Sequence, residues 1–383
     1  MCRTISHLSF LLAAPLLLSL SSGVLSKEVK TLEIGSTAPA FELPGVDGKT
    51  YRLDDFDDAK VLMIIFTCNH CPTAQAYEDR IIQLHKKYKD WGVAVVAISP
   101  NDPKAVRLDE LGYTDVGDSF EDMKIRAKDK NFTFPYLYDG DTQKVSTAYG
   151  VLATPHVFIF DAKRKLRYVG RIDDSDVGTV TSHDARNALE ALLQDRPVPQ
   201  EKTRVFGCST KWSDKRQSAV DSLEKWNAEP VTLDTIDKKG VGELVANRTD
   251  KYRLINVWAT WCIPCVEELP ELVTINRMYR RRHFELITIC LDGLDNRDRA
   301  AKALVEKRVS STNYIFDSTD RDEFAEALDK QWRGPLPYTL LIAPGGKVVY
   351  RQHDTIDPLE LKKAIVGQLG RTYASRRNVR AAR

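Results

Sequence analysis

Two pairs of cysteines carry the chemistry that this sequence offers most directly. Cys68 and Cys71 form one Cys-x-x-Cys motif, and Cys262 and Cys265 form another. Two thiols at this spacing lie one helical turn apart, which is close enough for an intramolecular disulfide. The first thiol attacks a foreign disulfide, and the second resolves the mixed disulfide that results. We therefore predict two catalytic sites, with Cys68 and Cys262 attacking and Cys71 and Cys265 resolving.

The residues around each motif predict a strand that leads into a helix. Apolar, β-rich runs at 61–66 and 254–258 precede the cysteines, and helical patterns at 74–89 and 266–279 follow them. A thiol at a helix N-terminus meets unpaired backbone N–H groups and the positive end of the helix dipole. Both favour the thiolate, so we expect a lowered thiol pKa and a nucleophile near neutral pH.

The same order of elements occurs twice along the chain. In each half a second buried strand follows the helix, and two strands joined by a short turn precede a last helix. This alternation predicts an α/β fold with mixed sheets that end in an antiparallel hairpin. We predict domains at 27–195 and 229–383, joined by an inter-domain segment at 196–228. Prolines at its start indicate an extended linker, although the aromatic residues and the cysteine at 206–212 are less typical of one.

The two ends of the chain carry no catalytic pattern. Residues 1–26 have the basic, apolar and small-residue order of a signal peptide, which predicts a periplasmic or secreted protein. The apolar run at 8–20 is shorter than the roughly 20 residues that span a bilayer, and an uncleaved anchor is the alternative. No later stretch is apolar enough to cross a membrane. The basic C-terminal tail at 371–383 is expected to be a solvated, frayed terminus.

The second motif resembles the active-site signature of the thioredoxin superfamily, nearest to its TlpA/ResA type of exported oxidoreductase. The signature covers 258–265 and is followed by Pro270. The first half, through its residues at 35–43 and 47–49, resembles the redoxin (AhpC/TSA-like) branch of the same superfamily. These resemblances imply two tandem thioredoxin-like folds, each a mixed central sheet flanked by helices. They also imply thiol–disulfide oxidoreductase activity without a cofactor.

The resemblance further implies a substrate-guiding cis-proline that faces each cysteine pair. Pro155 and Pro337 match this position, and the residues before them are Thr154 and Leu336. Because the preceding residue touches the active site in the family, we expect the two sites to differ in substrate or redox poise.

The residues between the cysteines also differ between the two motifs. His70 can carry a positive charge, which would stabilise a thiolate and make the first disulfide more oxidising, whereas Pro264 cannot. We therefore predict a pKa-tuning role for His70, the alternative being an exposed residue without a role. Thioredoxins often place a buried acid six residues before the first cysteine, where this chain has Leu62 and Asn256.

The cysteine pairs have four other interpretations: a zinc site, covalent haem attachment, a peroxidase and a non-catalytic binding module. The two pairs lie much farther apart than the roughly 15–20 residues of a zinc ribbon, so we predict no metal site. Covalent haem attachment requires a histidine directly after the second cysteine, which neither motif has. The first domain could instead be a peroxiredoxin-like peroxidase reduced by the second domain. A non-catalytic thioredoxin-fold binding module is a further alternative.

Two cysteines lie outside the motifs in the predicted mature chain. Cys290 ends an apolar strand and is expected to be buried and inert. Cys208 lies between the domains and is a candidate redox relay, through which electrons would pass from the second cysteine pair to the first.

The expected partners follow from the chemistry and the charge. They are protein thiols or disulfides, with cytochrome c maturation substrates among the candidates, and a membrane or soluble electron donor. The 56 basic and 54 acidic residues nearly balance, which gives no reason to expect nucleic acid.

Overall fold

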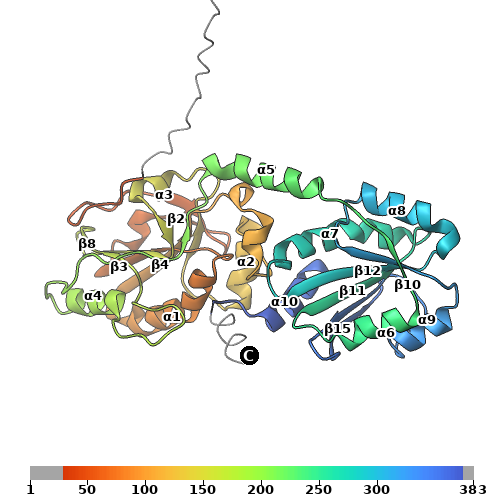
Figure 1. The fold of residues 1–383 in the computed structure, drawn as a ribbon. Helices are drawn as coiled ribbons and strands as arrows, with labels where there is room; N and C mark the ends of the chain where they lie inside the picture. The colour runs from red at the N-terminus through yellow and green to blue at the C-terminus, as the bar shows by residue number, and fades with distance from the viewer. Residues whose placement is uncertain (1–28, 374–383) are drawn as a thin grey trace, which may run out of the picture.

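The computed structural model describes residues 29–373, which form two α/β units lying side by side (Figure 1). Each unit has a mixed sheet with helices on both faces, so the predicted fold class is confirmed. The predicted signal peptide and the tail residues 374–383 lie outside the described residues. Among residues 29–373, no helix is long and apolar enough to cross a bilayer.

The sheet of the first unit has the strand order β5-β4-β3-β7-β8. Its inner strands β3 and β4 run parallel, whereas β7 runs antiparallel to β3 and forms the last hairpin with β8. The strands of this sheet are β3 (Val61–Phe66), β4 (Val93–Ser99), β5 (Tyr136–Tyr138), β7 (His156–Phe160) and β8 (Leu166–Gly170). Three further short strands of the unit are β1 (Glu42–Pro44), β2 (Thr50–Arg52) and β6 (Ala153–Thr154).

The sheet of the second unit repeats this order as β13-β12-β11-β14-β15 and adds β10 at its parallel edge. Here too the last two strands form the predicted antiparallel hairpin. The strands are β10 (Asp234–Ile236), β11 (Tyr252–Trp258), β12 (Phe284–Cys290), β13 (Thr312–Phe316), β14 (Tyr338–Ile342) and β15 (Val348–His353).

Helices cover both faces of each sheet, and the inner strand β3 is apolar and buried at every position. In β3, Met63 packs into the core on one face and Ile64 into the core on the other, and both are fully buried. A strand buried on both faces reads as a continuous apolar run, which explains why these strands are readable in the sequence. The helices are α1 (Pro72–Tyr88), α2 (Phe120–Asp129), α3 (Lys144–Tyr149), α4 (Asp184–Leu193), α5 (Arg216–Asn227), α6 (Lys238–Ala246), α7 (Ile263–Tyr279), α8 (Arg297–Glu306), α9 (Arg321–Leu328) and α10 (Pro358–Leu369).

The first half of the predicted inter-domain segment is part of the first unit, not an extended linker. The side chain of Phe206 packs into the core beside Tyr77, and Val169 forms a bridge with Lys202. Strand β9 (Cys208–Ser209) pairs with β6. Apolar burial and backbone pairing therefore hold this segment in place. The later part of the segment forms α5, which runs from one unit toward the other across the top of Figure 1.

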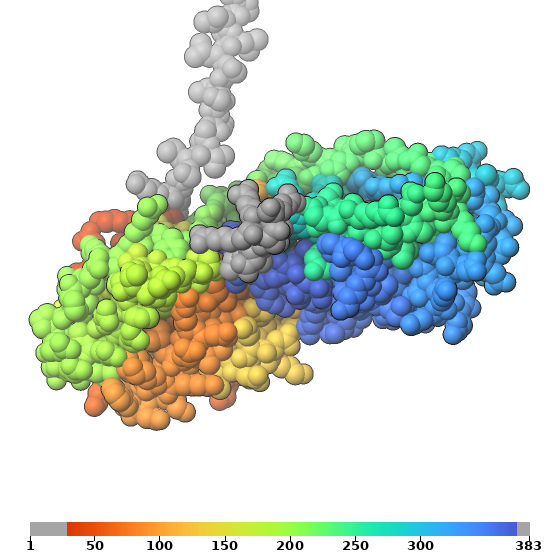
Figure 2. Space-filling view, turned by 60° about the horizontal axis from the view of Figure 1, so that its bottom comes forward, coloured from red at the N-terminus to blue at the C-terminus, as the bar shows by residue number. Residues whose placement is uncertain are grey.

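The C-terminal end of α7 packs against the first unit. The Tyr279 hydroxyl donates a hydrogen bond to the Thr114 carbonyl at 2.7 Å, and the Arg282 guanidinium lies 4.0 Å from the ring centre of Tyr113. The blue C-terminal segment also lies against the first unit in Figure 2, where Lys363 pairs with Asp129 at 3.5 Å. The two units therefore share an interface built on α7 and α10.

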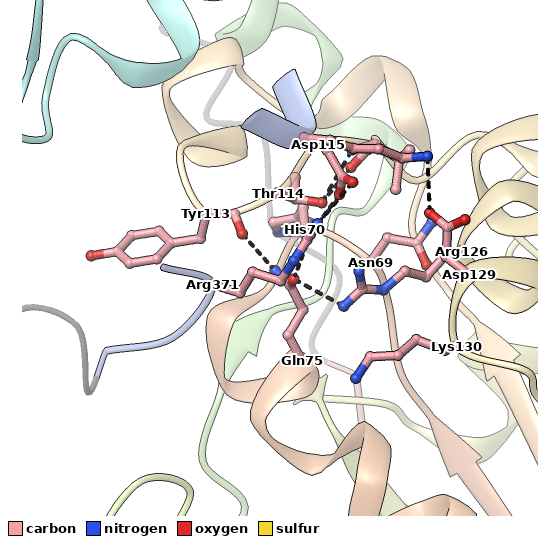
Figure 3. Close-up of polar contacts among 12 residues, drawn as sticks. Asn69, His70, Gln75, Tyr113, Thr114, Asp115, Arg126, Asp129, Lys130 and Arg371 are labelled. Atoms are coloured by element: carbon pink, nitrogen blue, oxygen red, sulfur yellow. Dashed lines mark hydrogen bonds and ion pairs between the residues drawn. The ribbon is translucent and has the colours of Figure 1, made fainter. Parts of the chain in front are cut away.

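The start of the basic tail is not solvated as we expected. Arg371 forms a two-pronged ion pair with the buried Asp115, at 2.6 and 2.8 Å, and so anchors the end of the second unit to the first (Figure 3). Such a bidentate pair is geometrically specific, which explains why this arginine is held against the first unit.

Candidate active sites

The second cysteine pair lies where the sequence places it, between a strand and a helix. Cys262 is the N-cap of α7, and its sulfur forms a disulfide with that of Cys265. Cys265 is fully buried, whereas Cys262 is 6% exposed and lies between the exposed side chains of Trp261 and Ile263. A substrate therefore meets the Cys262 sulfur first, on an apolar rim.

A buried acid near this site, which the sequence analysis missed, is Glu268. Asn256 occupies the position, six residues before Cys262, at which thioredoxins often have a buried acid. Its side-chain amide donates a hydrogen bond to Glu268 Oε1 at 2.8 Å. Burial raises the pKa of Glu268, against the opposing effect of its hydrogen bonds from the Ile356 N–H and Asn256. The signal was present in the sequence, because Glu268 follows Cys265 by three positions and so shares its side of the helix.

The first pair differs because the helix begins at the second cysteine. Cys71, not Cys68, is the N-cap of α1, and Pro72 occupies the first turn. Both thiols are free and almost fully buried. The Cys68 sulfur lies 3.1 Å from the Thr154 hydroxyl. The helix N-terminus that was expected to activate Cys68 therefore acts on Cys71.

The hydrogen bonds around the first pair favour a thiolate at Cys71. Its sulfur accepts the backbone N–H of Cys208 at 3.3 Å. Although burial raises the pKa of Cys71, hydrogen bonds from the Cys208 and Cys68 thiols and the charge of His70 bring that pKa well below its usual value. Burial and the bond to Cys71 raise the pKa of Cys68. These pKa shifts favour the thiolate at Cys71 over one at Cys68. The assignment of Cys68 as the attacking thiol stays a prediction.

His70 is buried rather than exposed, which makes the alternative of an exposed residue wrong. Its Nδ1 atom lies 2.5 Å from Asp118 Oδ2. Burial lowers the pKa of His70, but the charge and the hydrogen bond of Asp118 outweigh burial, so the pKa is raised overall. Asp118 also accepts the backbone N–H groups of Asn69 and His70. The raised pKa favours the charged imidazole, and that charge lowers the pKa of Cys71, as the tuning role requires.

The Asp118 loop is fixed by a polar network that reaches the second unit (Figure 3). The Gln75 side chain donates to the Tyr113 carbonyl at 3.0 Å and accepts from Arg126 at 3.1 Å. Arg371 holds Asp115 in the same loop. The first site is therefore positioned partly by residues of the domain interface.

One group of side chains near the first pair has the composition of a metal site. Cys68, His70 and Asp118 offer ligand atoms that lie within 4.8 Å of one another. However, His70 Nδ1 is hydrogen-bonded directly to Asp118 Oδ2, and Asp118 Oδ1 accepts two backbone N–H groups, so the carboxylate is already engaged on both oxygens. The group is thus better described as an ion pair beside a thiol, and we assign no metal to it.

The peptide bonds before both predicted guiding prolines, Thr154–Pro155 and Leu336–Pro337, are cis. Thr154 contacts both sulfurs of the first pair. Its hydroxyl lies against the Cys68 sulfur, and its carbonyl oxygen lies 3.3 Å from the Cys71 sulfur. Leu336 packs against the core that contains Cys262 and Cys265. The substrate-guiding role of the two prolines stays a prediction.

The remaining candidate cysteines have different surroundings. Cys290 is fully buried, and burial raises its pKa, as expected for an inert thiol. Cys208 lies beside Cys71, not between the two sites. Its position between the domains in the sequence therefore does not make it an intermediate between them in space.

Comparison with known proteins assigns the family. The AhpC/TSA family matches twice, over residues 34–169 and 210–351, and the chain belongs to this family. Thiol-disulfide oxidoreductase ResA of Oceanobacillus iheyensis is 27% identical over 139 residues, which cover 36% of this chain and 62% of that protein. ResA of Geobacillus thermodenitrificans is 26% identical over 167 residues, 43% of this chain and 81% of that protein.

Solved structures resemble single units of the chain. The crystal structure of an uncharacterized conserved protein from Geobacillus kaustophilus is 39% identical, with a TM-score of 0.43, and covers 47% of this chain and 93% of its own. A hypothetical protein from Sinorhizobium meliloti is 32% identical, with a TM-score of 0.43, and covers 48% and 97%. The matches to the AhpC/TSA family and to ResA confirm the resemblance stated from the motifs.

Proposed function

We propose that this chain is an exported thiol–disulfide oxidoreductase that exchanges disulfides at two Cys-x-x-Cys sites. The observation that carries the proposal is the second site, where a disulfide lies at the N-terminus of α7 and Cys262, at 6% exposed, is the more accessible of its two cysteines. Two relatives that bear the name thiol-disulfide oxidoreductase match this chain over more than a third of its length.

At the second site the reaction begins with the reduced pair. The Cys262 thiolate attacks a substrate disulfide and releases one substrate thiolate, which leaves a mixed disulfide. The Cys265 thiolate then attacks the Cys262 sulfur, forms the observed Cys262–Cys265 disulfide and releases the second substrate thiolate. Glu268, whose raised pKa keeps it available for proton exchange, takes the proton that Cys265 must lose.

The first site supports a second candidate function. The observation that favours it is the fully buried Cys71 at the N-cap of α1, with a pKa that its surroundings lower and with Cys68 packed beside it. A peroxide would be attacked by the Cys71 thiolate to give a sulfenic acid and water, and Cys68 would then condense with it and release a second water. The second domain would reduce the resulting disulfide.

The partners proposed for both functions are protein thiols and disulfides outside the cytoplasm. Cytochrome c maturation substrates and a membrane or soluble electron donor belong to the same proposal. The domain limits 27–195 and 229–383 stay a prediction. We propose to move the end of the first domain to about residue 212, because β9 and Phe206 belong to the first unit.

Turnover of a protein disulfide by single-site variants tests the main proposal. With insulin as substrate and a thiol as donor, Cys262→Ser is expected to lower the rate sharply. Cys290→Ser is expected to leave the rate unchanged, because Cys290 is fully buried and forms no disulfide. Peroxide consumption that disappears in Cys71→Ser but persists in Cys262→Ser, given a chemical reductant, would support the second candidate. Full insulin turnover by Cys262→Ser would contradict the role of the second site.

A further inference from the structure

The backbone next to Pro155 is already paired with another segment of the same chain. Strand β9 runs antiparallel to β6, with Cys208 opposite Thr154 and Ser209 opposite Ala153. The approach is so close that a Cβ atom on Gly207 would lie 2.1 Å from the Thr154 carbonyl oxygen. An extended substrate cannot pair with Thr154 while β9 is there.

This pairing delivers a third thiol to the buried pair. Cys208 packs against Cys68, Cys71 and Ala74, and its backbone N–H donates a hydrogen bond to the Cys71 sulfur at 3.3 Å. The Cys71 side chain therefore packs with two other cysteines, Cys68 and Cys208. Cys68 and Cys71 are 2% and 0% exposed, whereas Cys208 is partly exposed. Of the three thiols, Cys208 is the one that a reagent in solution can reach.

We propose that Cys208 is a third redox thiol of the first site, and that Cys71 alternates between a disulfide with Cys208 and one with Cys68. This rests on the proposed disulfide-exchange function. In this proposal Cys208 passes electrons between the buried pair and a reagent in solution, not between the two domains. The proposal also names the substrate class of the first site as small disulfides, since β9 blocks a protein backbone.

The exchange balances as follows for oxidised glutathione. The Cys208 thiolate attacks the glutathione disulfide and releases one glutathione thiolate. The Cys71 thiolate attacks the Cys208 sulfur, which forms the Cys71–Cys208 disulfide and releases the second glutathione thiolate. The Cys68 thiolate then attacks the Cys71 sulfur, forms Cys68–Cys71 and frees the Cys208 thiolate. Two electrons pass to glutathione, and its two thiolates take up the two protons that the thiols of the pair have lost.

The cross-link itself can be detected by mass spectrometry. The experiment uses the full chain with the second site silenced by Cys262→Ser and Cys265→Ser. The further change Cys68→Ser removes the thiol that would attack the Cys71–Cys208 disulfide, so this disulfide should accumulate. After treatment with oxidised glutathione, non-reducing tryptic digestion should join the peptide of residues 61–80 to that of residues 205–211. The matched variant Cys71→Ser should give at least tenfold less of this cross-link. Glutathione adducts on Cys71 and Cys208 without the cross-link would overturn the proposal.

The rate of oxidation provides a second, independent readout. In the same silenced background, Cys208→Ala should slow formation of the Cys68–Cys71 disulfide by glutathione at least tenfold, and Cys290→Ala should not change it. An unchanged rate in Cys208→Ala would overturn the proposal even if Cys68→Ser failed to fold. Because the second site is silenced, failure here is distinguishable from failure of the proposed function, which insulin turnover by the intact chain reports.

Discussion

At the scale of single residues, the ion pair of His70 and Asp118 sets the charge beside the first cysteine pair. Both side chains are almost fully buried, so the pair acts in a medium where charges interact strongly. Burial of the pair is tolerated because Asp118 also accepts the Asn101 amide at 2.7 Å and two backbone N–H groups.

Replacement of Asp118 by asparagine should raise the thiolate pKa of the first site. Without the carboxylate, burial lowers the pKa of His70, the imidazole becomes neutral, and the Cys71 thiolate loses a positive neighbour. An opposite charge at this range shifts a pKa by about 1–3 units, so we expect a rise of about one unit or more. The measurement is the pH dependence of iodoacetamide alkylation at Cys71 in the reduced chain. A thiolate pKa that does not move would refute the tuning role of His70.

The same substitution should destabilise the chain in a pH-dependent way. Because the folded pKa of His70 is raised, its contribution is fully present below about pH 6.5 and is lost as the pH rises through the folded value. Because the folded pKa of Asp118 is lowered, its contribution is present above about pH 3.9 and is lost as the pH falls through the folded value. The urea midpoint should therefore drop more in Asp118→Asn at pH 5.5 than at pH 9. An equal drop at both values would contradict this account.

At the scale of elements, the contact of β9 with β6 closes the first site. Gly207 has a φ of +146° and lies against the Thr154 carbonyl, so a side chain is excluded both by the backbone conformation and by space. The pairing depends on this one position.

Gly207→Ala should therefore lift β9 from the first site. We expect a loss of about 1–3 kcal/mol in stability, and faster alkylation of Cys71 under native conditions. The matched control is Gly242→Ala in α6, where a Cβ meets nothing within 4 Å and alanine favours the helix. Cys71 alkylation as slow in Gly207→Ala as in Gly242→Ala would show that β9 does not cover the site.

The sequence predicts those elements whose pattern lies within a short stretch of the chain, and it does not predict contacts between distant residues. The strands β3 and β11 and both motifs are readable because apolar runs and cysteine spacing are local. Pro72 also indicates where α1 starts, because proline favours the first position of a helix. The motif alone suggested instead that the helix begins at the first cysteine. The contacts of Cys71 with Cys208 and of His70 with Asp118 join residues 137 and 48 positions apart, and no local pattern reports them.

At the scale of the whole molecule, the interface separates the two sites within one chain. The C-terminal end of α7 contacts the first unit, whereas Cys262 caps the opposite end of the same helix. A helix of 17 residues is about 25 Å long, which is far beyond the reach of disulfide exchange. Electrons can therefore pass from the second pair to the first only between chains, through a small thiol, or after the units separate.

Electron transfer from the second cysteine pair to the first should accordingly occur between two protein molecules. If Cys262 and Cys265 are reduced selectively while the first pair is oxidised, the rate of reduction of Cys68 and Cys71 should rise in proportion to protein concentration. Quenched-flow alkylation followed by mass spectrometry measures this rate. A rate that is independent of concentration would show that the units separate and exchange within one chain.

The central claim, that this AhpC/TSA-family chain exchanges disulfides through its Cys-x-x-Cys motifs, is tested most directly by removing one thiol from each motif at once. The measurement is the rate of insulin reduction, with a thiol donor, by the chain carrying Cys68→Ser and Cys262→Ser, compared with wild type and with Cys290→Ser. Each motif then lacks one of the two thiols that its disulfide requires. We predict that the rate falls to that of the thiol donor alone, while Cys290→Ser keeps the wild-type rate. A double variant that retains the wild-type rate would contradict the account.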